Sequence, residues 1–465
     1  MKDQIMSDHP AFLKTHRNQI RNRAGEVVTL RGVGLGGWMN MENFVTGFTA
    51  NESAFRQVVS ETLGEEKANF LFDRYLEYFF SEEDAQFIHS LGLNLVRLPF
   101  NYRHFEDDMH PFTLHETGFK HLDRAIELCA RHQIYTILDL HAAPGYQNQD
   151  WHSDNPTAQA LFWQHKHFQD RAIWLWEIIA DRYKDNPWVA GYDPLNEPSD
   201  PSKMAINSFY RRVFEAIRKI DPDHILFLEG NHYSQDFSVL EPPFENVVYS
   251  PHDYATPGFI DGGPYPGVSR GEYIDRSVLH ANFLNTCQYM LENQTPIWIG
   301  EFGPVYTGIP EKDAPRYQLL KDQLALYQEF GASWCLWTYK DLGLQGVVSP
   351  RPDSQWVKKI KPVLEKKAIL GADSWGGSDH HIRQIMEPIE QTFAEFFPNH
   401  HPFPFDTHWH INRTVRHILL SEPLLEDFRL LLQGLSLNEI DGLMSSFQFR
   451  NCRPRERLCQ IVQPG

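Results

Sequence analysis

The chain has 465 residues, 42% of them hydrophobic, which is enough to bury a large core. α/β barrels of about 200–400 residues form a single domain, so this length does not require several domains. The formal net charge of −18 argues against a nucleic-acid partner or an anionic membrane surface, because phosphate binding needs clusters of basic residues. The charge suits a neutral or cationic ligand.

Two further features of the sequence concern the compartment. The first 20 residues mix charged and polar side chains and contain no apolar signal-peptide core, and no run of about 18 apolar residues exists anywhere. The five cysteines are scattered, which suits reduced thiols, although Cys452 and Cys459 could pair. We therefore expect a cytoplasmic protein that does not span a membrane.

The chain begins with a predicted hairpin and continues with alternating strands and helices. The hairpin covers about residues 18–30, with its turn near residues 22–25, and could plug one end of a barrel. Short β-branched or aromatic runs predict strands at 28–35, 93–98, 135–140, 189–195, 225–228, 247–250, 297–300 and 333–338. Apolar residues at helical spacing predict helices at 68–78, 82–91, 120–132, 161–183, 202–220, 272–291 and 314–330. Eight strands, each followed by a helix or long loop, predict a (β/α)8 TIM barrel.

The composition changes after about residue 350. A glycine-rich break at 371–378 divides a catalytic domain, residues 1–370, from a helical C-terminal extension, residues 371–465, that we expect to pack on the barrel. Helices are predicted at 382–396, 424–432 and 437–445. The histidines of this region (His380, His381, His400, His401, His408 and His410) lack carboxylate or cysteine partners at ligand spacing, so we expect no metal site, and the Pro-Phe-Pro-Phe run at 402–405 is interpreted as loop packing.

Charged or ring-bearing residues collect where the predicted strands end. In a (β/α)8 barrel the carboxyl ends of the strands form the rim on which catalytic groups are placed. The residues at these positions are Arg97, His141, Asn196, Glu197, Glu229, His252, Tyr254, Glu301 and Trp337. Seven of the eight predicted strands contribute to this set, so the pattern indicates a site at the rim.

The two glutamates carry the strongest functional signal. Glu197 lies in Gly191-Tyr-Asp-Pro-Leu-Asn-Glu-Pro198, and Glu301 follows the apolar run in Pro296-Ile-Trp-Ile-Gly-Glu-Phe-Gly303. A glycosidase needs two facing carboxylates, one that passes a proton and one that attacks or stabilises a sugar cation. We expect burial beside a second carboxylate to raise the pKa of Glu197. The plainer interpretation is a helix-capping Asn196 beside an incidental Glu197.

These residues, in this order, resemble glycoside hydrolase family 5, a retaining family with its acid/base after strand four and its nucleophile after strand seven. The resemblance covers about residues 18–350. The opening segment Leu30-Arg-Gly-Val-Gly-Leu-Gly-Gly-Trp38 is similar to the first barrel strand of the exo-acting β-glucanases of the family, except that Gly34 stands where an Asn is common. The tail beyond residue 380 has no counterpart in the simple cellulases.

The resemblance implies a role for each rim residue. Glu301 would be the nucleophile that forms a covalent glycosyl-enzyme, and Glu197 would be the acid/base. Arg97 and Tyr254 would keep Glu301 ionised, since a nearby cation and hydroxyl donors favour a charged carboxylate. The remaining residues would contact substrate or Glu197: Asn196 at the sugar 2-hydroxyl, His141 and His252 at sugar hydroxyls or Glu197, and Trp337 beneath the cleaved sugar. No cofactor is implied.

Weaker expectations concern further contacts. Trp38, Tyr146, Trp151 and Tyr339 could stack on sugars or simply pack in the core, and Lys340 and Asp341 could bond a terminal sugar. Two predicted long loops, 44–63 and 258–271, together with the helical extension, could wall one end of the cleft. We therefore expect exo-action on short β-linked oligosaccharides or glycosides, as in a β-glucosidase, a β-xylosidase or an exo-β-glucanase.

Several alternatives stay open at this point. One is an endo-acting β-glucanase or cellulase, which needs a cleft open at both ends. Another is a sugar-binding barrel without catalysis, against which both carboxylates and their supporting residues speak. A third is a metal-dependent hydrolase that uses His141, His252 and Glu229, although these residues do not form a recognised ligand spacing.

Overall fold

The computed structural model describes residues 11–254, 264–269, 272–372, 375 and 378–463. Eight parallel strands form one sheet, in the order β11-β12-β3-β4-β5-β6-β7-β8. Parallel bridges from Tyr249 to Ile297 and from His252 to Glu301 join the two edges of this sheet, so the barrel closes. The strands are β3 (Arg31–Gly34), β4 (Leu95–Asn101), β5 (Tyr135–Ala142), β6 (Val189–Asp193), β7 (Ile225–Glu229), β8 (Val247–Ser250), β11 (Trp298–Phe302) and β12 (Ser333–Leu336). The predicted (β/α)8 TIM barrel is confirmed.

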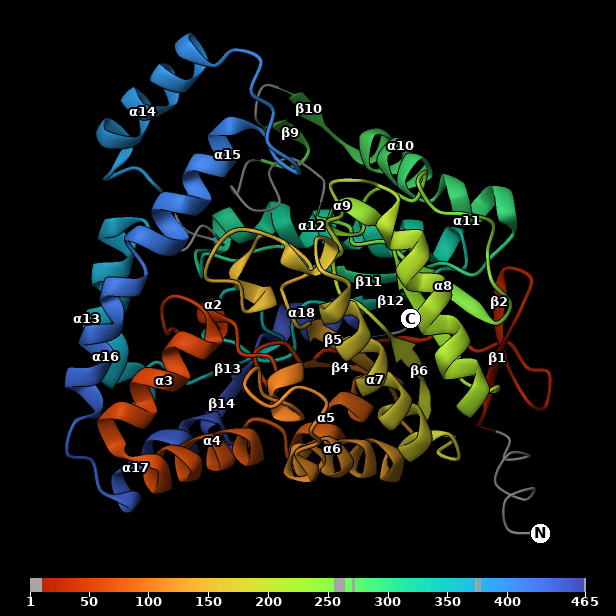
Figure 1. Cartoon of the computed structure of the whole chain (residues 1–465), viewed down its shortest axis with the longest axis horizontal. Coiled ribbons are helices and arrows are strands. Elements are labelled where there is room, and N and C mark those ends of the chain that lie inside the picture. The colour runs from red at the N-terminus through yellow and green to blue at the C-terminus, as the bar shows by residue number, and fades with distance from the viewer. Residues whose placement is uncertain (1–10, 255–263, 270–271, 373–374, 376–377, 464–465) are drawn as a thin grey trace.

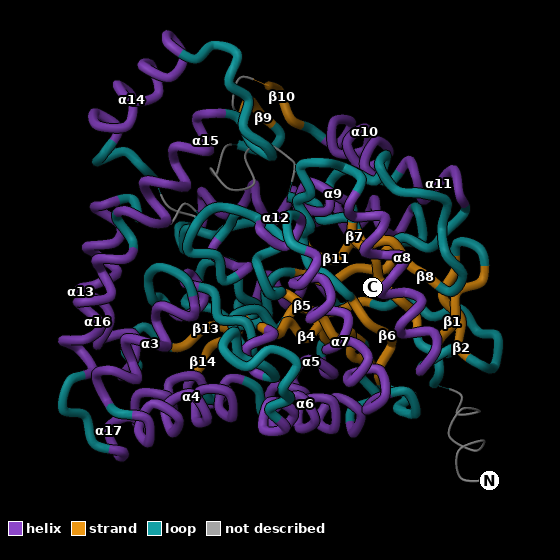
Figure 2. The backbone as a smooth tube through the Cα atoms, in the orientation of Figure 1, coloured by secondary structure: helices purple, strands orange, loops and turns teal. Residues whose placement is uncertain are grey.

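Helices surround the barrel strands (Figures 1 and 2). Those of the barrel are α4 (Glu65–Phe79), α5 (Glu82–Ser90), α6 (Phe119–Arg131), α7 (Lys166–Tyr183), α8 (Ala205–Ile220), α9 (Asn231–Ser234), α10 (Arg276–Thr286), α11 (Gln288–Asn293), α12 (Pro310–Glu329) and α13 (Gln355–Leu370). The predicted helix at 272–291 is in fact strand β10 (Glu272–Ile274) followed by α10 and α11. The helix α13 was not predicted, because Pro362 lies inside it.

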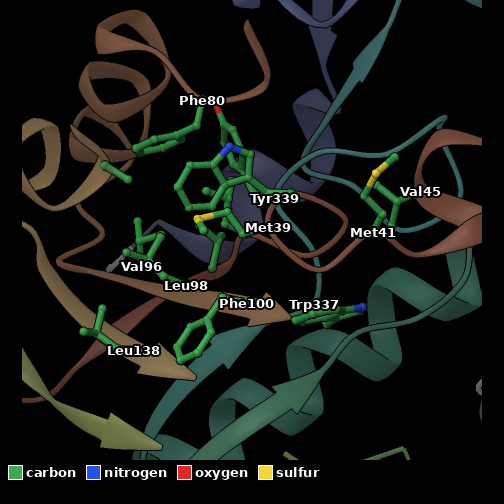
Figure 3. Close-up of a cluster of buried hydrophobic side chains, with 14 of the residues drawn as sticks. Met39, Met41, Val45, Phe80, Val96, Leu98, Phe100, Leu138, Trp337 and Tyr339 are labelled. Atoms are coloured by element: carbon green, nitrogen blue, oxygen red, sulfur yellow. The ribbon is translucent and has the colours of Figure 1, made fainter. Parts of the chain in front are cut away.

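The alternation of side chains along the strands separates two buried clusters. Val96, Leu98 and Phe100 of β4 point toward the helices and belong to the larger cluster, part of which Figure 3 shows. Leu95 of β4 belongs to the smaller cluster inside the barrel. Because successive side chains of a strand point to opposite faces, Arg97 also points into the barrel. The alternation of side chains along β4 thus directs the Arg97 guanidinium toward the barrel axis.

The N-terminal region contains the predicted hairpin and one strand more. Strands β1 (Leu13–His16) and β2 (Gln19–Asn22) pair antiparallel around Arg17 and Asn18. The predicted turn at 22–25 follows β2, with an antiparallel bridge between Arg21 and Val27. Leu13 and Ile20 pack with Leu95 in the cluster inside the barrel. The hairpin therefore covers the end of the barrel at which the strands begin, opposite to the predicted site.

One predicted loop is a pair of helices. Residues 44–63, expected to be a long loop, form most of α2 (Asn43–Thr46) and all of α3 (Glu52–Leu63). Phe55 and Val59 lie one turn apart and are buried against the barrel helices, which is the reason this polar segment is helical. Of the other predicted loop, residues 264–269 are described and contain β9 (Gly267–Ser269), which pairs with β10; residues 258–263 and 270–271 lie outside the described part.

The C-terminal segment packs along one side of the barrel (blue in Figure 1). It contains α14 (Arg383–Phe396), α15 (Thr407–Asn412), a π-helical segment (Arg413–Leu419), α16 (Leu425–Leu432), α17 (Leu437–Met444) and α18 (Glu456–Val462). Phe428 of α16 meets Phe55 of α3 edge-on, with ring centroids 5.3 Å apart. Strand β14 (Cys452–Pro454) pairs antiparallel with β13 (Val348–Pro350). This segment shares the larger buried cluster with the barrel.

Two sequence-based expectations about covalent and membrane features can be compared with the structure. Cys452 and Cys459 do not pair, and all five cysteines are buried and free. Within the described ranges, no helix combines the length and the apolar character that crossing a bilayer requires.

Candidate active site

The carboxyl ends of the barrel strands open into a cavity of about 1020 Å³. Glu197, just after β6, and Glu301, on β11, both line it, although they are 104 positions apart in sequence. A carboxylate oxygen of Glu197, one of Glu301 and a ring nitrogen of His252 all lie within 4.8 Å of one another. The two carboxylates therefore lie close together at the rim, as the sequence predicts.

Glu301 is held from below by the barrel interior. Arg97 Nη1 donates to Glu301 Oε1, and the Tyr254 hydroxyl donates to Oε2 over 3.4 Å. His252 Nδ1 lies 3.7 Å from the same Oε2. Burial and the nearby Glu197 raise the pKa of Glu301, whereas His252 and Arg97 favour its ionised form. The side chain is 5% exposed, and that exposed part faces the cavity.

Glu197 is fixed through both its backbone and its side chain. Its φ of 45° is left-handed, an uncommon conformation for a non-glycine residue, and its backbone N–H donates to Glu229 Oε2 over 2.7 Å. Its carboxylate lies 2.8 Å from His252 Nδ1 and 3.0 Å from His152 Nε2. Burial favours the protonated acid, but the two imidazoles lower the pKa of Glu197 below its ordinary value. This corrects our expectation of a raised pKa, because the sequence did not indicate two imidazole neighbours.

Arg97 is the centre of a buried group of charges beneath the cavity. Its Nη2 lies 2.9 Å from Asp193, 2.9 Å from Glu229 and 3.1 Å from Asp139. Burial raises the pKa of Asp139 to about 6 despite Arg97, and burial together with Glu229 raises the pKa of Asp193. These carboxylates in turn raise the pKa of Arg97, so it stays cationic. One guanidinium therefore orders four acidic side chains, Glu301 among them.

His141 is a neutral imidazole at the end of β5. Its Nδ1 lies 2.8 Å from Asp139 Oδ2, and its Nε2 lies 3.3 Å from Asn196 Nδ2. Burial lowers the pKa of His141 to about 3. A neutral ring with its proton on Nδ1 donates to Asp139 and accepts from Asn196, which fits both contacts.

Trp337 forms one wall of the cavity against His141. The two rings are stacked, with centroids 5.3 Å apart and an interplanar angle of 3°. A Cβ atom on Gly34 would lie 2.6 Å from Trp337 Cε3, and one on Gly36 would lie 2.4 Å from Cζ2. The resemblance would favour Asn at position 34. The glycine that stands there leaves room for the Trp337 ring.

The structure separates the predicted site residues into three groups. Those that line the cavity are His141, Trp151, Glu197, Tyr254, Glu301 and Trp337. Those behind it, fully enclosed, are Arg97, Asn196 and His252. The Asn196 amide, expected to meet a sugar hydroxyl, instead accepts from Arg97 Nη2 over 2.8 Å and faces His141.

The remaining predicted contacts lie away from the cavity. Trp38 is fully buried, and its Nε1 donates to the Leu76 carbonyl over 2.9 Å. The Tyr339 hydroxyl donates to Asp84 over 2.8 Å, and Lys340 pairs with the same carboxylate. Asp341 accepts backbone N–H groups of its own turn, and Tyr146 does not line the cavity. Trp38 and Tyr339 are thus packed in the protein interior, the second of the two interpretations given for them.

Metal ligation can be examined from the donor atoms. His141, His252 and Glu229 do not converge as a ligand set; among the described residues searched, the converging group is Glu197, His252 and Glu301. Arg97 donates to Glu301 in this group, and this fixed positive charge opposes a bound cation. The donor set therefore does not fit a metal centre.

Several residues of the cavity were not predicted. His152 directly follows the predicted Trp151, and Glu42 lies four positions after Trp38, which ends the opening segment. A second group comes from loops and helices of the barrel: Phe44, Asp150, Tyr233, Gln235, Val305, Tyr306, Thr307, Arg316 and Leu344. The C-terminal segment supplies the rest: Trp375, Ser378, Asp379, Arg383, Phe405, His408, Trp409, Asn412, Arg413, Arg416 and His417. Phe405 belongs to the run interpreted as loop packing; its ring packs on Tyr233, with centroids 5.0 Å apart, and it also forms part of the cavity wall.

The C-terminal wall is tied to the barrel by one buried ion pair. Arg413 donates from Nε to Asp150 Oδ1 over 2.6 Å and from Nη2 to Oδ2 over 2.9 Å, and its guanidinium lies 3.6 Å above the Phe405 ring. Although burial opposes ionisation, Arg413 and His417 lower the pKa of Asp150 well below its ordinary value. On the other side, Trp375 donates to Gln345 Oε1 over 2.6 Å and meets Tyr254 edge-on.

Comparisons with known proteins agree with this arrangement. The model of the cellulase family, glycosyl hydrolase family 5, matches residues 65–343. A protein named beta-xylosidase from Phanerodontia chrysosporium is 45% identical over 470 residues, which cover 97% of this chain and 98% of that protein. Endoglucanase C of Acetivibrio thermocellus is 24% identical over 307 residues, or 58% of this chain and 87% of the relative.

A solved structure described as that of a glycoside hydrolase has the same fold. It superposes with a TM-score of 0.52 at 21% identity, covering 67% of this chain and 89% of its own. The barrel fold and the two carboxylates at the ends of β6 and β11 agree with the family match. The chain therefore belongs to glycosyl hydrolase family 5 and is a glycoside hydrolase.

Proposed function

We propose that the protein is a retaining β-glycosidase that removes single sugars from the ends of short β-linked oligosaccharides and glycosides, β-xylosides in particular. The observation that carries this proposal is the approach of Glu197 and Glu301 carboxylate oxygens to within 4.8 Å. Retaining enzymes hold their carboxyl groups about 5–5.5 Å apart, and inverting enzymes about 6.5–9.5 Å apart to admit a water.

In the first chemical step, Glu301 attacks the anomeric carbon while Glu197 gives a proton to the departing oxygen. Arg97 and the Tyr254 hydroxyl support an ionised Glu301, which the attack requires. The glycosyl–Glu301 ester formed in this step carries no charge at Glu301. In the second step Glu197 therefore takes a proton from the incoming water without a second anion beside it.

The source of the acid proton follows from the neighbours of Glu197. His152 and His252 both lie within 3.0 Å of the Glu197 carboxylate. Burial lowers the pKa of each imidazole, but the acidic neighbours of each ring outweigh burial and raise it. A proton held on the pair of Glu197 and His152 can move to Glu197 as the leaving oxygen develops negative charge. The pair titrates as a unit, so its apparent pKa values belong to both groups.

Exo-action is supported by the C-terminal wall. Residues between Trp375 and His417 line the cavity opposite the barrel strands, and the Asp150–Arg413 pair ties them to the loop after β5. The match to the beta-xylosidase includes this segment, since it covers 97% of the chain, whereas the match to endoglucanase C covers 58%. We infer that the segment closes the cavity at one end and that a xylose or glucose unit occupies it.

A panel of p-nitrophenyl β-glycosides tests the proposal, followed by product analysis on xylo-oligosaccharides. We expect β-xyloside hydrolysis, release of xylose alone at early times, and a loss on the order of 10⁴-fold in kcat for Glu301→Gln. Azide should restore turnover of an activated xyloside in Glu197→Ala, because a small nucleophile needs no base. Near-normal hydrolysis by both variants contradicts the mechanism, and early release of mixed oligosaccharides contradicts exo-action.

A further inference from the structure

A different part of the cavity wall contains a buried arginine that forms no ion pair with a described acid. Arg316, on α12, lines the cavity and is 5% exposed. Its Nε and Nη1 have no hydrogen-bond partner, and none of its nitrogens lies within ion-pairing distance of an acid among the described residues. Burying a guanidinium without a partner is costly, so an unpaired buried arginine requires an explanation.

The other arginines of the same cavity make this one distinctive. Arg383 pairs with Asp379 at 2.7 Å and with Glu390. Arg413 binds Asp150 through two nitrogens, and Arg416 donates to the Gly371 carbonyl and to Asn412 Oδ1. Of the four arginines that line the cavity in the described part of the chain, Arg316 is the one without a hydrogen-bonded or ion-paired protein oxygen, although Asp313 favours its charged form from a greater distance.

The acid nearest to Arg316 in sequence is already occupied. Asp313 accepts from Thr307 N over 2.7 Å, from Thr307 Oγ1 over 2.9 Å and from Gly308 N over 2.9 Å. Those bonds hold the loop between β11 and α12 and leave Asp313 outside ion-pairing distance of Arg316. The guanidinium is therefore placed in the wall by the helix but is not neutralised by it.

A second unpaired donor lines the cavity beside this helix. The Tyr306 hydroxyl is buried and has no hydrogen-bond partner in the described structure, while its ring is fixed by stacking on Tyr317 at 4.8 Å. The Tyr306 backbone is also fixed, since its N–H donates to the Leu344 carbonyl over 2.7 Å. Tyr306 follows Glu301 by five positions, so this donor belongs to the same strand end as the proposed nucleophile.

We propose that Arg316 and Tyr306 form a subsite for a carboxylate carried by the sugar substrate, that is, for a uronic acid residue linked to the neutral sugar. Guanidinium and phenol are both donors at the pH at which a uronate is ionised, and arginine binds carboxylates through charge-assisted hydrogen bonds. The subsite deepens the proposed function and rests on it, because it assigns an acidic class of β-linked oligosaccharide to the same cavity.

Binding to a protein that cannot turn over tests this subsite. In Glu301→Gln we compare the Kd of xylobiose with that of an aldobiouronate, glucuronic acid linked to xylose, by calorimetry. The aldobiouronate should bind at least 10-fold more tightly. Adding Arg316→Met should remove this preference and leave the Kd of xylobiose within twofold. Adding Tyr306→Phe should reduce the preference for the aldobiouronate about threefold. The matched control, Arg383→Met, removes a cation that is already paired and should change the preference by less than twofold.

Each other outcome overturns the subsite. Equal affinity for the acidic and the neutral disaccharide contradicts it, as does an equal effect of Arg316→Met and Arg383→Met. Sodium sulfate that displaces the aldobiouronate at equal concentration indicates a general anion site instead. Thermal unfolding is an independent test. Arg316→Met should not lower Tm, because it removes a buried charge that forms no ion pair. A fall in Tm or a failure to fold would show that the guanidinium stabilises the fold instead. Turnover of a p-nitrophenyl β-xyloside by the wild-type protein tests the proposed function separately.

Discussion

The two walls of the cavity are built in different ways. The barrel wall presents Glu197 and Glu301 above Arg97, whose acidic partners all come from the ends of neighbouring strands. The C-terminal wall is joined to the barrel by long-range contacts, among them the pair between Arg413 and Asp150, 263 positions apart. The barrel therefore supplies the chemistry proposed here, and the C-terminal segment shapes the space in which a substrate lies. Substitutions in the two walls should have different consequences.

The largest effect is expected for Arg97→Met in the barrel wall. This change leaves Asp139, Asp193, Glu229 and Glu301 buried without their common cation. Breaking a buried ion pair costs about 3–5 kcal/mol, so the free energy of unfolding in urea should fall by that amount. Arg131→Met, which removes an exposed pair with Glu82, is the control and should change it by less than about 0.5 kcal/mol. Equal effects of the two variants would show that the buried charges are not organised by Arg97.

An intermediate effect is expected for Arg413→Met in the C-terminal wall. It leaves Asp150 buried and unpaired and loosens the segment that covers the cavity. We expect KM for xylo-oligosaccharides to rise about 10-fold, equivalent to about 1.4 kcal/mol of binding, with kcat changed less. Arg429→Met, in the exposed pair with Glu61, is the matched control on the same segment and should leave KM within twofold. A fall in kcat with unchanged KM would assign the pair to the barrel wall instead.

The smallest effect is expected for His152→Asn, where the two walls meet. The imidazole lies 3.0 Å from Glu197 and lowers the pKa of that carboxyl group. Without it, the proton that the pair of Glu197 and His152 holds is left to Glu197 alone, whose pKa His252 still lowers. The alkaline limb of kcat/KM should therefore move down by about one pH unit.

The control for this change is His408→Asn, which removes a cavity histidine that lies 2.9 Å from Glu390 and not from Glu197. Its pH profile should keep the wild-type alkaline limb. An upward shift of that limb in His152→Asn, or the same shift in both variants, would show that the pair of Glu197 and His152 does not hold the acid proton.

The carboxylates of the barrel wall could be predicted from the sequence, whereas Tyr306 and Arg316 of the same wall and the whole C-terminal wall could not. A strand period of two places Arg97 inside the barrel, and a buried apolar run before Glu301 places its carboxylate at the rim; both follow from local sequence. The pairing of Arg413 with Asp150 depends on how a distant helical segment docks, for which no local pattern exists. Trp38 shows the limit within the barrel itself, because an aromatic residue after a strand packs equally well into the helix layer.

The central claim is that Glu301 forms a covalent bond to the sugar while Glu197 stands within reach to protonate the leaving oxygen. Incubation with a 2-deoxy-2-fluoro β-xyloside that carries a good leaving group, followed by mass spectrometry of the digested protein, tests it directly. We predict one fluoroxylosyl group per chain, on the peptide that contains Glu301, and slow release when an acceptor is added. Inactivation without a label, or a label on another carboxylate, would contradict the account.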